Sequence, residues 1–199
     1  KQLMGRYMTM AFRTSYRILC DLNDSEEVTQ KVFLHVWKNA SRYDFRYSVS
    51  IWIYRILVRL CHERLRKRRL MDLFSSGPAV YEASAPAALS PEEDFITKET
   101  WAIFCRASSV LSPKHRTVFV LKDLEGLSTE DIVSITGMTS GQIKSHLDLA
   151  RKRIIEDDFK FCPECGMSFS NEKAADKKEN ERKINEARFE GIKQAFSFL

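Results

Sequence analysis

Residues that interrupt helices are scarce in this sequence. Only 7 Gly and 5 Pro occur among 199 residues, while hydrophobic residues make up 44% of the chain. Glycine and proline are the residues least compatible with a helix interior, and strong helix formers occupy many of the other positions. The composition therefore predicts an all-α fold.

Long apolar runs are also missing. No stretch approaches the roughly 20 consecutive apolar residues that a membrane-spanning helix needs. The first residues contain no apolar core of a secretory signal peptide. Together these two absences predict a cytoplasmic protein.

Cysteine is present, but not in the pattern of a disulfide framework. The five cysteines are an odd number at irregular spacing, which argues against a set of structural disulfides. Cys20, Cys61 and Cys105 fall within apolar helical patterns, where a free cysteine usually behaves as a small buried residue. Cys162 and Cys165 instead form a Cys-x-x-Cys turn near the end of the chain.

A catalytic constellation is missing as well. The four histidines are His35, His62, His115 and His146, and none has a serine, cysteine or aspartate partner at the spacing of a known catalytic motif. The sequence also lacks a glycine-rich loop that could hold phosphate groups. We predict that the protein is not an enzyme.

Charge is distributed unevenly along the chain. Residues 1–70 carry 15 basic and 6 acidic side chains, whereas residues 71–95 carry five acids and no base. The rest of the chain is close to neutral. A solvated surface without a function would mix the two signs more evenly, so the basic first segment predicts a contact with nucleic acid.

Helical patterns and breaks divide the chain into four parts. Residues 1–70 contain three helices with apolar periodicity, and residues 96–157 contain four helical signals. Residues 71–95, with SSGP, ASAPAAL and SPEED, have the composition of a linker. Residues 158–199 hold the Cys-x-x-Cys turn and a charged amphipathic helix. The sequence thus predicts two small helical domains joined by an acidic linker and followed by a helical tail.

The second helix of the first domain is expected to begin near Asp24 or Ser25, where acids occupy the first turn. Its predicted apolar stripe consists of Val28, Val32, Phe33, Val36 and Trp37. The third helix, over residues 51–70, is apolar at its start and densely basic at its end.

The segment LSTEDIVSITGMTSGQIKSHLDLARKR has the pattern of a helix–turn–helix. A short helix capped near Ser128 meets a turn at Gly137, and a second helix capped by Thr139 or Ser140 follows. The outer face of that second helix would carry side chains that can reach base edges: Ser140, Gln142, Lys144, Ser145, His146 and Asp148. Arg151, Lys152 and Arg153 would hold phosphates. The alternative is a plain two-helix hairpin without a ligand.

The segment SRYDFRYSVSIWIYRI interleaves aromatic residues with arginines. The aromatic members are Tyr43, Phe45, Tyr47, Trp52 and Tyr54, and the basic members are Arg42, Arg46 and Arg55. Aromatic rings stack on bases and arginines neutralise phosphates, a combination that suits single-stranded DNA. The alternative is that several of these rings are core residues, with Trp52 anchoring its helix. The basic run RLRKRR, residues 64–69, is expected to follow phosphates beside this loop.

In this order the motifs resemble an extracytoplasmic-function sigma factor of bacterial RNA polymerase. Residues 1–70 are similar to region 2 of that family, and residues 96–157 are similar to region 4. The resemblance rests on DSEEVTQKVFLHVW, on RYDFRYSVSIWIYRI followed by the basic run, and on LSPKHRTVFVLKDLEGLSTEDIVSITGMTSGQIKSHLDLARKR. It covers about three-quarters of the chain.

The resemblance implies three partners: core RNA polymerase (its clamp helices and flap), promoter DNA and an anti-sigma factor. Binding of the clamp helices would fall to Glu27, Gln30, Lys31 and Leu34. Lys31 stands where the family usually has an acid, so this contact is expected to be altered. The acidic linker, residues 71–95, would thread through the polymerase cleft.

The resemblance also implies roles in promoter recognition. The loop and the helix after it would capture and hold the opened strand of the minus-ten element through Arg42, Tyr43, Phe45, Arg46, Ser48, Trp52, Tyr54, Arg55 and Arg59. Arg59 stands where the family usually has asparagine. The helix–turn–helix would read the minus-thirty-five element through Ser140, Gln142, Lys144, Ser145, His146, Arg151 and Arg153. Leu149 stands where the family usually has an arginine, so one phosphate contact is expected to be lost.

Two other functions remain open. One is a transcriptional regulator that binds duplex DNA through its helix–turn–helix and has no polymerase function. The other is a zinc-dependent interaction protein, in which Cys162 and Cys165 would bind zinc with ligands from elsewhere. A lone Cys-x-x-Cys is a weak metal motif, and a tight turn is the alternative. The tail, residues 158–199, is expected to pack on its own protein, and the alternative is that it binds a partner. If it packs on the DNA-reading face, it would act as an internal brake on DNA binding.

Overall fold

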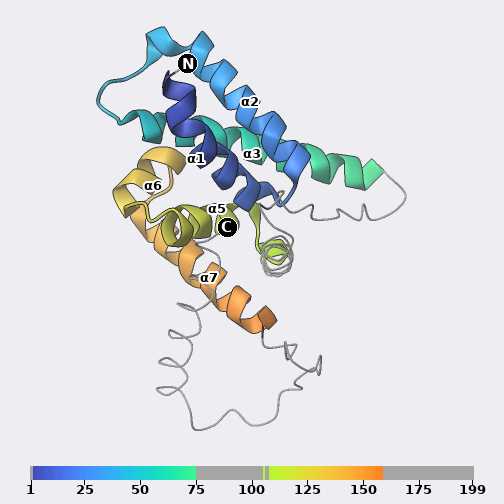
Figure 1. The fold of residues 1–199 in the computed structure, drawn as a ribbon. Helices are drawn as coiled ribbons and strands as arrows, with labels where there is room; N and C mark the ends of the chain where they lie inside the picture. The colour runs from blue at the N-terminus through green and yellow to red at the C-terminus, as the bar shows by residue number, and fades with distance from the viewer. Residues whose placement is uncertain (1, 75–104, 106–107, 159–199) are drawn as a thin grey trace, which may run out of the picture.

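The computed structural model describes residues 2–74, 105 and 108–158 (Figure 1). Its helices are α1 (Gln2–Leu19), α2 (Leu22–Lys38), the short 3-10 turn η1 (Ala40–Arg42), α3 (Val49–Phe74), α5 (Pro113–Phe119), the π-helical turn η2 (Val120–Leu124), α6 (Thr129–Thr136) and α7 (Ser140–Asp158). These described segments contain no strand, which confirms the all-α prediction. Residues 71–74 of the predicted linker belong to α3, whereas residues 75–95 of the linker and nearly all of the predicted tail lie outside the described residues.

The first unit of the fold consists of α1, α2 and α3, which pack against one another. α1 ends where Cys20 adopts a left-handed backbone conformation, with φ of 52°. Asp21 then caps α2, because its side chain accepts a hydrogen bond from the backbone N–H of Asp24 at 2.8 Å. This cap starts α2 at Leu22, earlier than the start near Asp24 or Ser25 that the acids of the first turn predicted.

The apolar stripe of α2 is confirmed except at one position. Val28, Val32, Phe33 and Val36 are buried in the core. Trp37 was predicted to belong to the same stripe, and that prediction is wrong, because its side chain is 83% exposed. Val36 beside it is buried, so Trp37 lies on the outward side of the last turn of α2.

The second unit consists of α5, η2, α6 and α7. Ser112 caps α5. Gly126, which has a φ of 69°, lies in the short connection between η2 and α6. Ser128 caps α6, which ends at the left-handed Gly137 as the sequence predicted. Thr139 and Gln142 exchange hydrogen bonds across the first turn of α7, an arrangement that satisfies free N–H groups of that turn.

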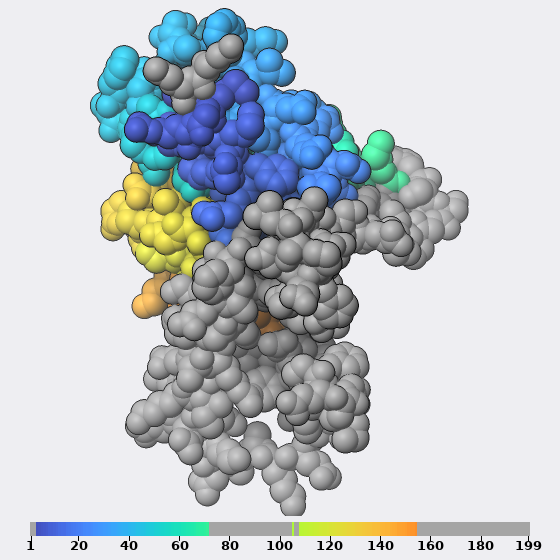
Figure 2. Space-filling model, viewed as in Figure 1, coloured from blue at the N-terminus to red at the C-terminus, as the bar shows by residue number. Residues whose placement is uncertain are grey.

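The two units pack directly on each other (Figures 1 and 2). α3 lies against α6 and α1 lies against η2, and in Figure 2 the yellow surface that includes α6 adjoins the blue and teal surface of the first helices. Buried side chains from both units, such as Leu57 and Phe119, belong to a single apolar core. The sequence predicted two domains joined by a linker and did not predict that they pack together. Periodicity within each helix does not show which surfaces of two domains meet.

An ion pair joins the two units inside this interface. Arg17 of α1 donates to the carboxylate of Glu125 at 2.9 Å, and the two side chains are 1% and 3% exposed. Tyr54 of α3 donates to the other carboxylate oxygen at 3.1 Å. Burial lowers the pKa of Arg17 while the charge of Glu125 opposes that shift. Each buried charge therefore depends on the other unit for its partner.

Within the described part of the chain, no helix has the length and apolarity needed to cross a membrane.

Candidate nucleic-acid interface

Aromatic rings gather at the start of α3 and in the loop before it. The ring of Tyr43 lies 4.9 Å from that of Phe45 and 5.0 Å from that of Trp52, measured between centroids. The Tyr43 hydroxyl donates to the backbone carbonyl of Tyr47 at 2.5 Å, which holds the loop in shape. Phe45 is 90% exposed. The cluster therefore presents an aromatic surface to solvent on a loop that is already ordered.

Arginines surround this aromatic cluster. Arg46 pairs with Asp44 in the loop at 2.6 Å, and its side chain stays largely exposed. The hydrogen bonds from Arg46 lower the pKa of the Asp44 carboxyl. The guanidinium of Arg55 lies 4.9 Å from the ring centroid of Tyr47, a cation–π contact. Arg42 is exposed beside them, so positive charge lies next to the exposed rings.

Three of the residues predicted to contact single-stranded DNA also have roles in the fold: Ser48, Trp52 and Tyr54. Ser48 caps α3, because its hydroxyl accepts from the N–H of Ile51 at 3.3 Å. Trp52 is half-buried against the core and also touches the aromatic cluster. Tyr54 departs from the predicted set, because its side chain is buried and bonded to Glu125. Burial and the Glu125 carboxylate both raise the pKa of Tyr54. In this arrangement Tyr54 joins the two units and is not available to DNA.

The outward face of α2 carries the residues expected to bind polymerase. Gln30 and Lys31 are exposed, and Leu34 is 58% exposed. Glu27 is half-buried and forms ion pairs with Lys31 and, at 3.6 Å, with Arg64. The hydrogen bond from Lys31 lowers the pKa of Glu27. Trp37 extends this face. Its exposure was not predictable from the sequence, because a tryptophan in phase with an apolar stripe indicates a core residue.

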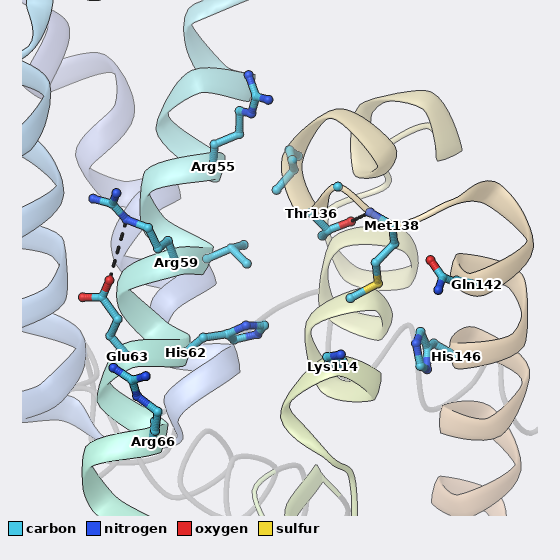
Figure 3. A pocket seen from close by; sticks show the side chains of 13 residues that line it. Arg55, Arg59, His62, Glu63, Arg66, Lys114, Thr136, Met138, Gln142 and His146 are labelled. Atoms are coloured by element: carbon cyan, nitrogen blue, oxygen red, sulfur yellow. Dashed lines mark hydrogen bonds and ion pairs between the residues drawn. The ribbon is translucent and has the colours of Figure 1, made fainter.

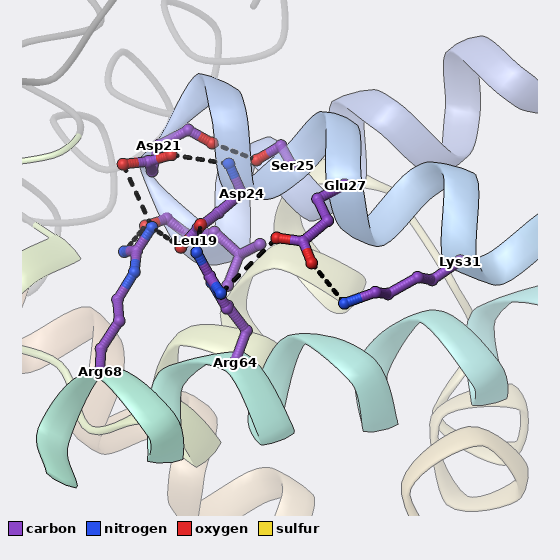
Figure 4. Close-up of polar contacts among 8 residues, drawn as sticks. All are labelled: Leu19, Asp21, Asp24, Ser25, Glu27, Lys31, Arg64 and Arg68. Atoms are coloured by element: carbon purple, nitrogen blue, oxygen red, sulfur yellow. Dashed lines mark hydrogen bonds and ion pairs between the residues drawn. The ribbon is translucent and has the colours of Figure 1, made fainter. Parts of the chain in front are cut away.

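Two arginines of the basic run have structural roles (Figure 4). Arg64 and Arg68 both form ion pairs with Asp24, and Arg68 also pairs with Asp21 at 3.2 Å. Burial alone would raise the pKa of Asp24, but the hydrogen bond from Arg64 and the charge of Arg68 outweigh it and lower the pKa. Residues 64–69 were expected as a whole to follow phosphates. For Arg64 and Arg68 that expectation does not fit the structure, since the helix turns them toward α2.

The remaining basic residues of that run point elsewhere. Arg66, Lys67 and Arg69 are exposed. Arg59 lies before this run in α3 and is exposed as well. Its guanidinium contacts the ring of His35 at 2.8 Å and the carboxylate of Glu63 at 3.8 Å. α3 therefore separates a buried basic edge from a solvent-exposed one.

The start of α7 presents most of the predicted base-reading residues. Ser140, Gln142, Lys144 and Ser145 are exposed, while Ile143 and Leu147 pack into the core. His146 is half-buried, with its ring centroid 4.9 Å from that of His115. Burial, followed by the charges of His146 and Arg153, lowers the pKa of His115. The two imidazole rings thus lie against each other at the side of this helix.

Two of the three predicted phosphate contacts of α7, Arg151 and Arg153, differ from each other in the structure. Arg153 is exposed and donates only a long hydrogen bond, at 3.4 Å, to the carbonyl of Val110. Arg151 donates two hydrogen bonds to Asp123, at 2.6 and 2.9 Å, and the Asp123 side chain is 3% exposed. Arg151 therefore compensates a buried carboxylate, a role that the spacing of the basic residues did not reveal.

Residues predicted for both promoter elements meet in one cleft between the units (Figure 3). The cleft has a volume of about 680 Å³. Arg55, Arg59 and Arg66 of α3 line one side, with Gln142 and His146 of α7 on the other. Lys114 adds another positive charge, and Glu63 is the acidic residue among the lining side chains. The cleft is strongly basic and has the size of a small-molecule pocket.

Metal binding finds no support within the described ranges. They contain no group of three or more His, Cys, Asp or Glu side chains arranged to hold a metal ion. Cys162 and Cys165, with the possible zinc site, lie outside those ranges.

Comparisons with known proteins match both units. Residues 3–70 match the family model for Sigma-70 region 2, and residues 106–154 match that for Sigma-70 region 4. The chain is 25% identical over 155 residues to the ECF RNA polymerase sigma factor SigW of Bacillus subtilis, covering 74% of this chain and 82% of that protein. It is 26% identical over 153 residues to SigE of Mycolicibacterium smegmatis, covering 77% of this chain and 59% of that protein.

A solved structure has a similar fold. The sigma factor RpoE of Bartonella quintana, solved in complex with the anti-sigma factor NepR, is 22% identical to this chain and superposes with a TM-score of 0.64. The match covers 78% of this chain and 94% of that one. A second structure, CnrH in complex with the cytosolic domain of CnrY, gives a TM-score of 0.57 at 17% identity.

Proposed function

Because the chain belongs to the extracytoplasmic-function sigma factors, which act in transcription initiation, we propose that it binds core RNA polymerase and recognises two promoter elements. The observation that carries this proposal is the exposed aromatic–arginine loop before α3, which a regulator of duplex DNA does not need. Sigma factors are not enzymes, and we propose that the polymerase supplies all of the catalysis. Such a role would place the protein in the cytoplasm.

We propose that polymerase docks on the outward face of α2. Leu34 and Trp37 are both large, apolar and exposed, and their spacing places them on one side of α2. Apolar side chains that gather on one surface mark a site of interaction with another protein. Gln30 and Lys31 flank them with polar groups. An apolar centre with a polar rim is the usual composition of a protein–protein interface. The lysine at position 31 makes this surface less acidic than is usual in the family.

We propose that the aromatic cluster captures the opened minus-ten element. A base in a duplex hides its faces in the stack, so the rings of Tyr43, Phe45 and Trp52 can stack only on bases that have left it. Arg42, Arg46 and Arg55 would neutralise the phosphates of the captured strand. Melting would then be driven by thermal opening, and these pockets would hold the open strand.

We propose that α7 reads the minus-thirty-five element in the major groove. Its first turn presents short polar side chains, and Gln142 and Lys144 have the functional groups that recognise adenine and guanine. Arg153 would contact a phosphate. Arg151 would support the helix from behind through Asp123.

The packing of the two units implies that promoter binding requires them to separate. Arg55, Arg59, Gln142 and His146 face the same cleft of about 680 Å³, which is far too small for a DNA duplex. Two promoter elements at separate sites along the DNA cannot both be reached from it. We propose that the described arrangement is a closed form, and that an anti-sigma factor would bind and retain a form of this kind.

Run-off transcription with purified core polymerase tests the proposal. Templates carrying candidate promoters are transcribed with core enzyme alone and with core enzyme plus this protein. We expect a specific transcript only in the second case, and its loss when Phe45 and Trp52 are replaced by alanine. Promoter binding without any effect of core polymerase would instead support the alternative of a helix–turn–helix regulator.

A further inference from the structure

Two thiols meet at the junction between the two units. Cys20 follows the last residue of α1, and Cys105 lies next to the second unit. The Cys20 sulfur lies 3.3 Å from the hydroxyl of Ser108, and that hydroxyl donates to the carbonyl of Cys105 at 3.1 Å. The side chain of Cys105 also lies close enough to Cys20 to affect its ionisation. Cys105 and Ser108 therefore both lie near Cys20.

The backbone of Cys20 is arranged in an uncommon way. Its φ of 52° lies in the left-handed region that usually favours glycine at the end of a helix. A residue with a side chain at this position carries a steric cost that glycine would avoid. The conformation is held by the hydrogen bond from the Cys20 N–H to the Tyr16 carbonyl at 2.8 Å. Strain at a reactive side chain is a feature that recurs at functional sites.

Two guanidinium groups surround the end of α1. Arg116 donates to the carbonyls of Ile18 and Ser108, each at 3.0 Å. Arg68 donates to the carbonyl of Leu19 at 3.1 Å (Figure 4). The carbonyl end of a helix repels negative charge, and these two cations reverse that effect at Cys20.

This environment favours the thiolate of Cys20. The hydrogen bond from the Cys105 thiol, together with the charge of Arg116 and the Ser108 hydroxyl, lowers the pKa of Cys20 to about 7. The same hydrogen bond raises the pKa of Cys105. A thiolate beside a protonated partner thiol is the arrangement of a cysteine pair that oxidises readily. Cys61 is a contrast, because it is fully buried and burial raises its pKa.

We propose that Cys20 and Cys105 are a redox modification site, at which a peroxide joins them in a disulfide that locks the two units together. The bond would link α1 of the first unit to the start of the second. The units could then no longer separate, so both promoter-reading faces would stay in the cleft. The effect on transcription rests on the function proposed above, whereas formation of the bond does not.

The chemistry balances with hydrogen peroxide as the oxidant. The Cys20 thiolate attacks one peroxide oxygen, the O–O bond breaks, and the leaving hydroxide takes a proton to become water. Cys20 is then a sulfenic acid. The Cys105 thiol attacks its sulfur, the S–S bond forms, the S–O bond breaks, and hydroxide leaves with the thiol proton as a second water. The two thiols lose two electrons and two protons, and the peroxide is reduced to two waters.

Peptide mapping tests the bond itself. The protein is the full chain with Cys162→Ser and Cys165→Ser, which removes the two tail thiols and keeps Cys20, Cys61 and Cys105. It is treated with hydrogen peroxide, free thiols are blocked with N-ethylmaleimide, and peptides are identified by mass spectrometry. We expect a dithiothreitol-sensitive peptide pair joined through Cys20 and Cys105. Recovery of both residues as separate alkylated or sulfinic peptides would overturn the proposal.

Run-off transcription tests the lock. The same protein is assayed with core polymerase before and after peroxide treatment, and we expect a loss of at least about tenfold, reversed by dithiothreitol. Cys105→Ser in the same background is the matched control and should keep its transcription after peroxide. If the disulfide is mapped but transcription is unchanged, the proposal that the disulfide holds the two units together is wrong. If the reduced protein supports no transcription at all, the proposed function fails, and the mapping still decides whether the bond forms.

Discussion

Individual charged residues in this protein divide into those that stabilise the fold and those that remain available to a partner. Arg64, Arg68 and Arg151 look the same as their neighbours in the sequence. In the structure each compensates a buried or half-buried carboxylate, whereas Arg66 and Arg153 are exposed. The distinction depends on which face of a helix meets another helix, because a carboxylate without its partner would be costly to bury.

Asp24→Asn should destabilise the protein near neutral pH. We expect about 2–3 kcal/mol, less than the ~3–5 kcal/mol of a fully buried pair, because Arg64 is partly exposed. The folded-state pKa of Asp24 lies below its ordinary value, so this stabilisation is complete above the unfolded pKa of about 4 and is lost as pH falls through the folded pKa. Urea denaturation at pH 7 and at pH 3 measures both effects.

Glu26→Gln is the matched control, since Glu26 is exposed on the same turn of α2. It should change the free energy of unfolding by less than about 0.5 kcal/mol at either pH. An equal loss of stability for both variants would show that Asp24 has no special role.

Cys20 should react at neutral pH while Cys61 does not. With a pKa of about 7 for Cys20, its rate of alkylation by iodoacetamide should rise as pH increases through 7, because only the thiolate is nucleophilic. Cys61 should stay unmodified in the native protein, since it is buried. Mass-spectrometric quantification of each modified cysteine across pH 5–9 gives both profiles, and a midpoint near the usual thiol range of about 8–9 would contradict the assignment.

At the scale of helices, capping and periodicity explain most of the helix ends and which face of each helix is buried. Ser112, Ser128 and Thr139 cap the helices that follow them, and Gly126 and Gly137 end segments in left-handed conformations. The surface of α2 is only partly explained by its own packing. Its inward face is apolar as predicted, and its outward face carries two large apolar residues in addition.

Trp37→Ala should weaken binding to core polymerase without weakening the fold. The side chain is largely exposed, so the free energy of unfolding should change by less than about 0.5 kcal/mol. An aromatic residue at an interface often contributes ~2 kcal/mol or more to binding, which corresponds to a loss of affinity of roughly 30-fold. Binding of labelled core enzyme by fluorescence anisotropy measures this, with Thr9→Ala on the exposed side of α1 as control. Equal affinities of the two variants would remove α2 from the docking surface.

Arg153→Ala and Arg151→Ala should separate two roles on α7. Arg153→Ala should reduce the slope of log affinity against log salt by about 0.9 for a promoter duplex, because one phosphate contact is lost. Arg151→Ala should lower thermal stability instead, since Asp123 would be left buried without its partner. Duplex binding at several salt concentrations, together with thermal unfolding, distinguishes the pair. An unchanged slope for Arg153→Ala would count against its phosphate role.

At the scale of the molecule, the described helices form two units that share one core. Glu125 is central to it, because its carboxylate receives Arg17 and Tyr54 from the first unit. Arg13 lies 3.8 Å away and adds a third, more exposed contact. A single buried acid thereby connects the second unit to two helices of the first.

Glu125→Ala should open the molecule. Arg17 would be left buried without its partner, a penalty of ~3–5 kcal/mol that separation of the units relieves. We expect a larger radius of gyration by small-angle X-ray scattering and tighter binding of free protein to promoter DNA. Glu130→Ala removes the same charge from the exposed start of α6 and serves as control. A scattering profile identical to that of the parent would mean that Glu125 does not hold the units together.

The sequence alone determined the helical class, the two units, the caps of α6 and α7 and most of the face of α7 that meets solvent. These follow from local rules, since propensity, capping and the 3.6-residue period act within a few residues of one another. It also determined the aromatic–arginine loop as the candidate surface for single strands, because residue type by itself specifies that chemistry.

Only the tertiary structure decided which of those residues are free to act. Tyr54 was predicted to contact DNA and is instead buried against Glu125, Trp37 was predicted to be buried and is exposed, and Cys20 meets Cys105 from far along the chain. Each outcome depends on a contact between segments distant in sequence. Such contacts are set by how two apolar surfaces fit together, and the order of residues within one helix does not encode the position of the next unit.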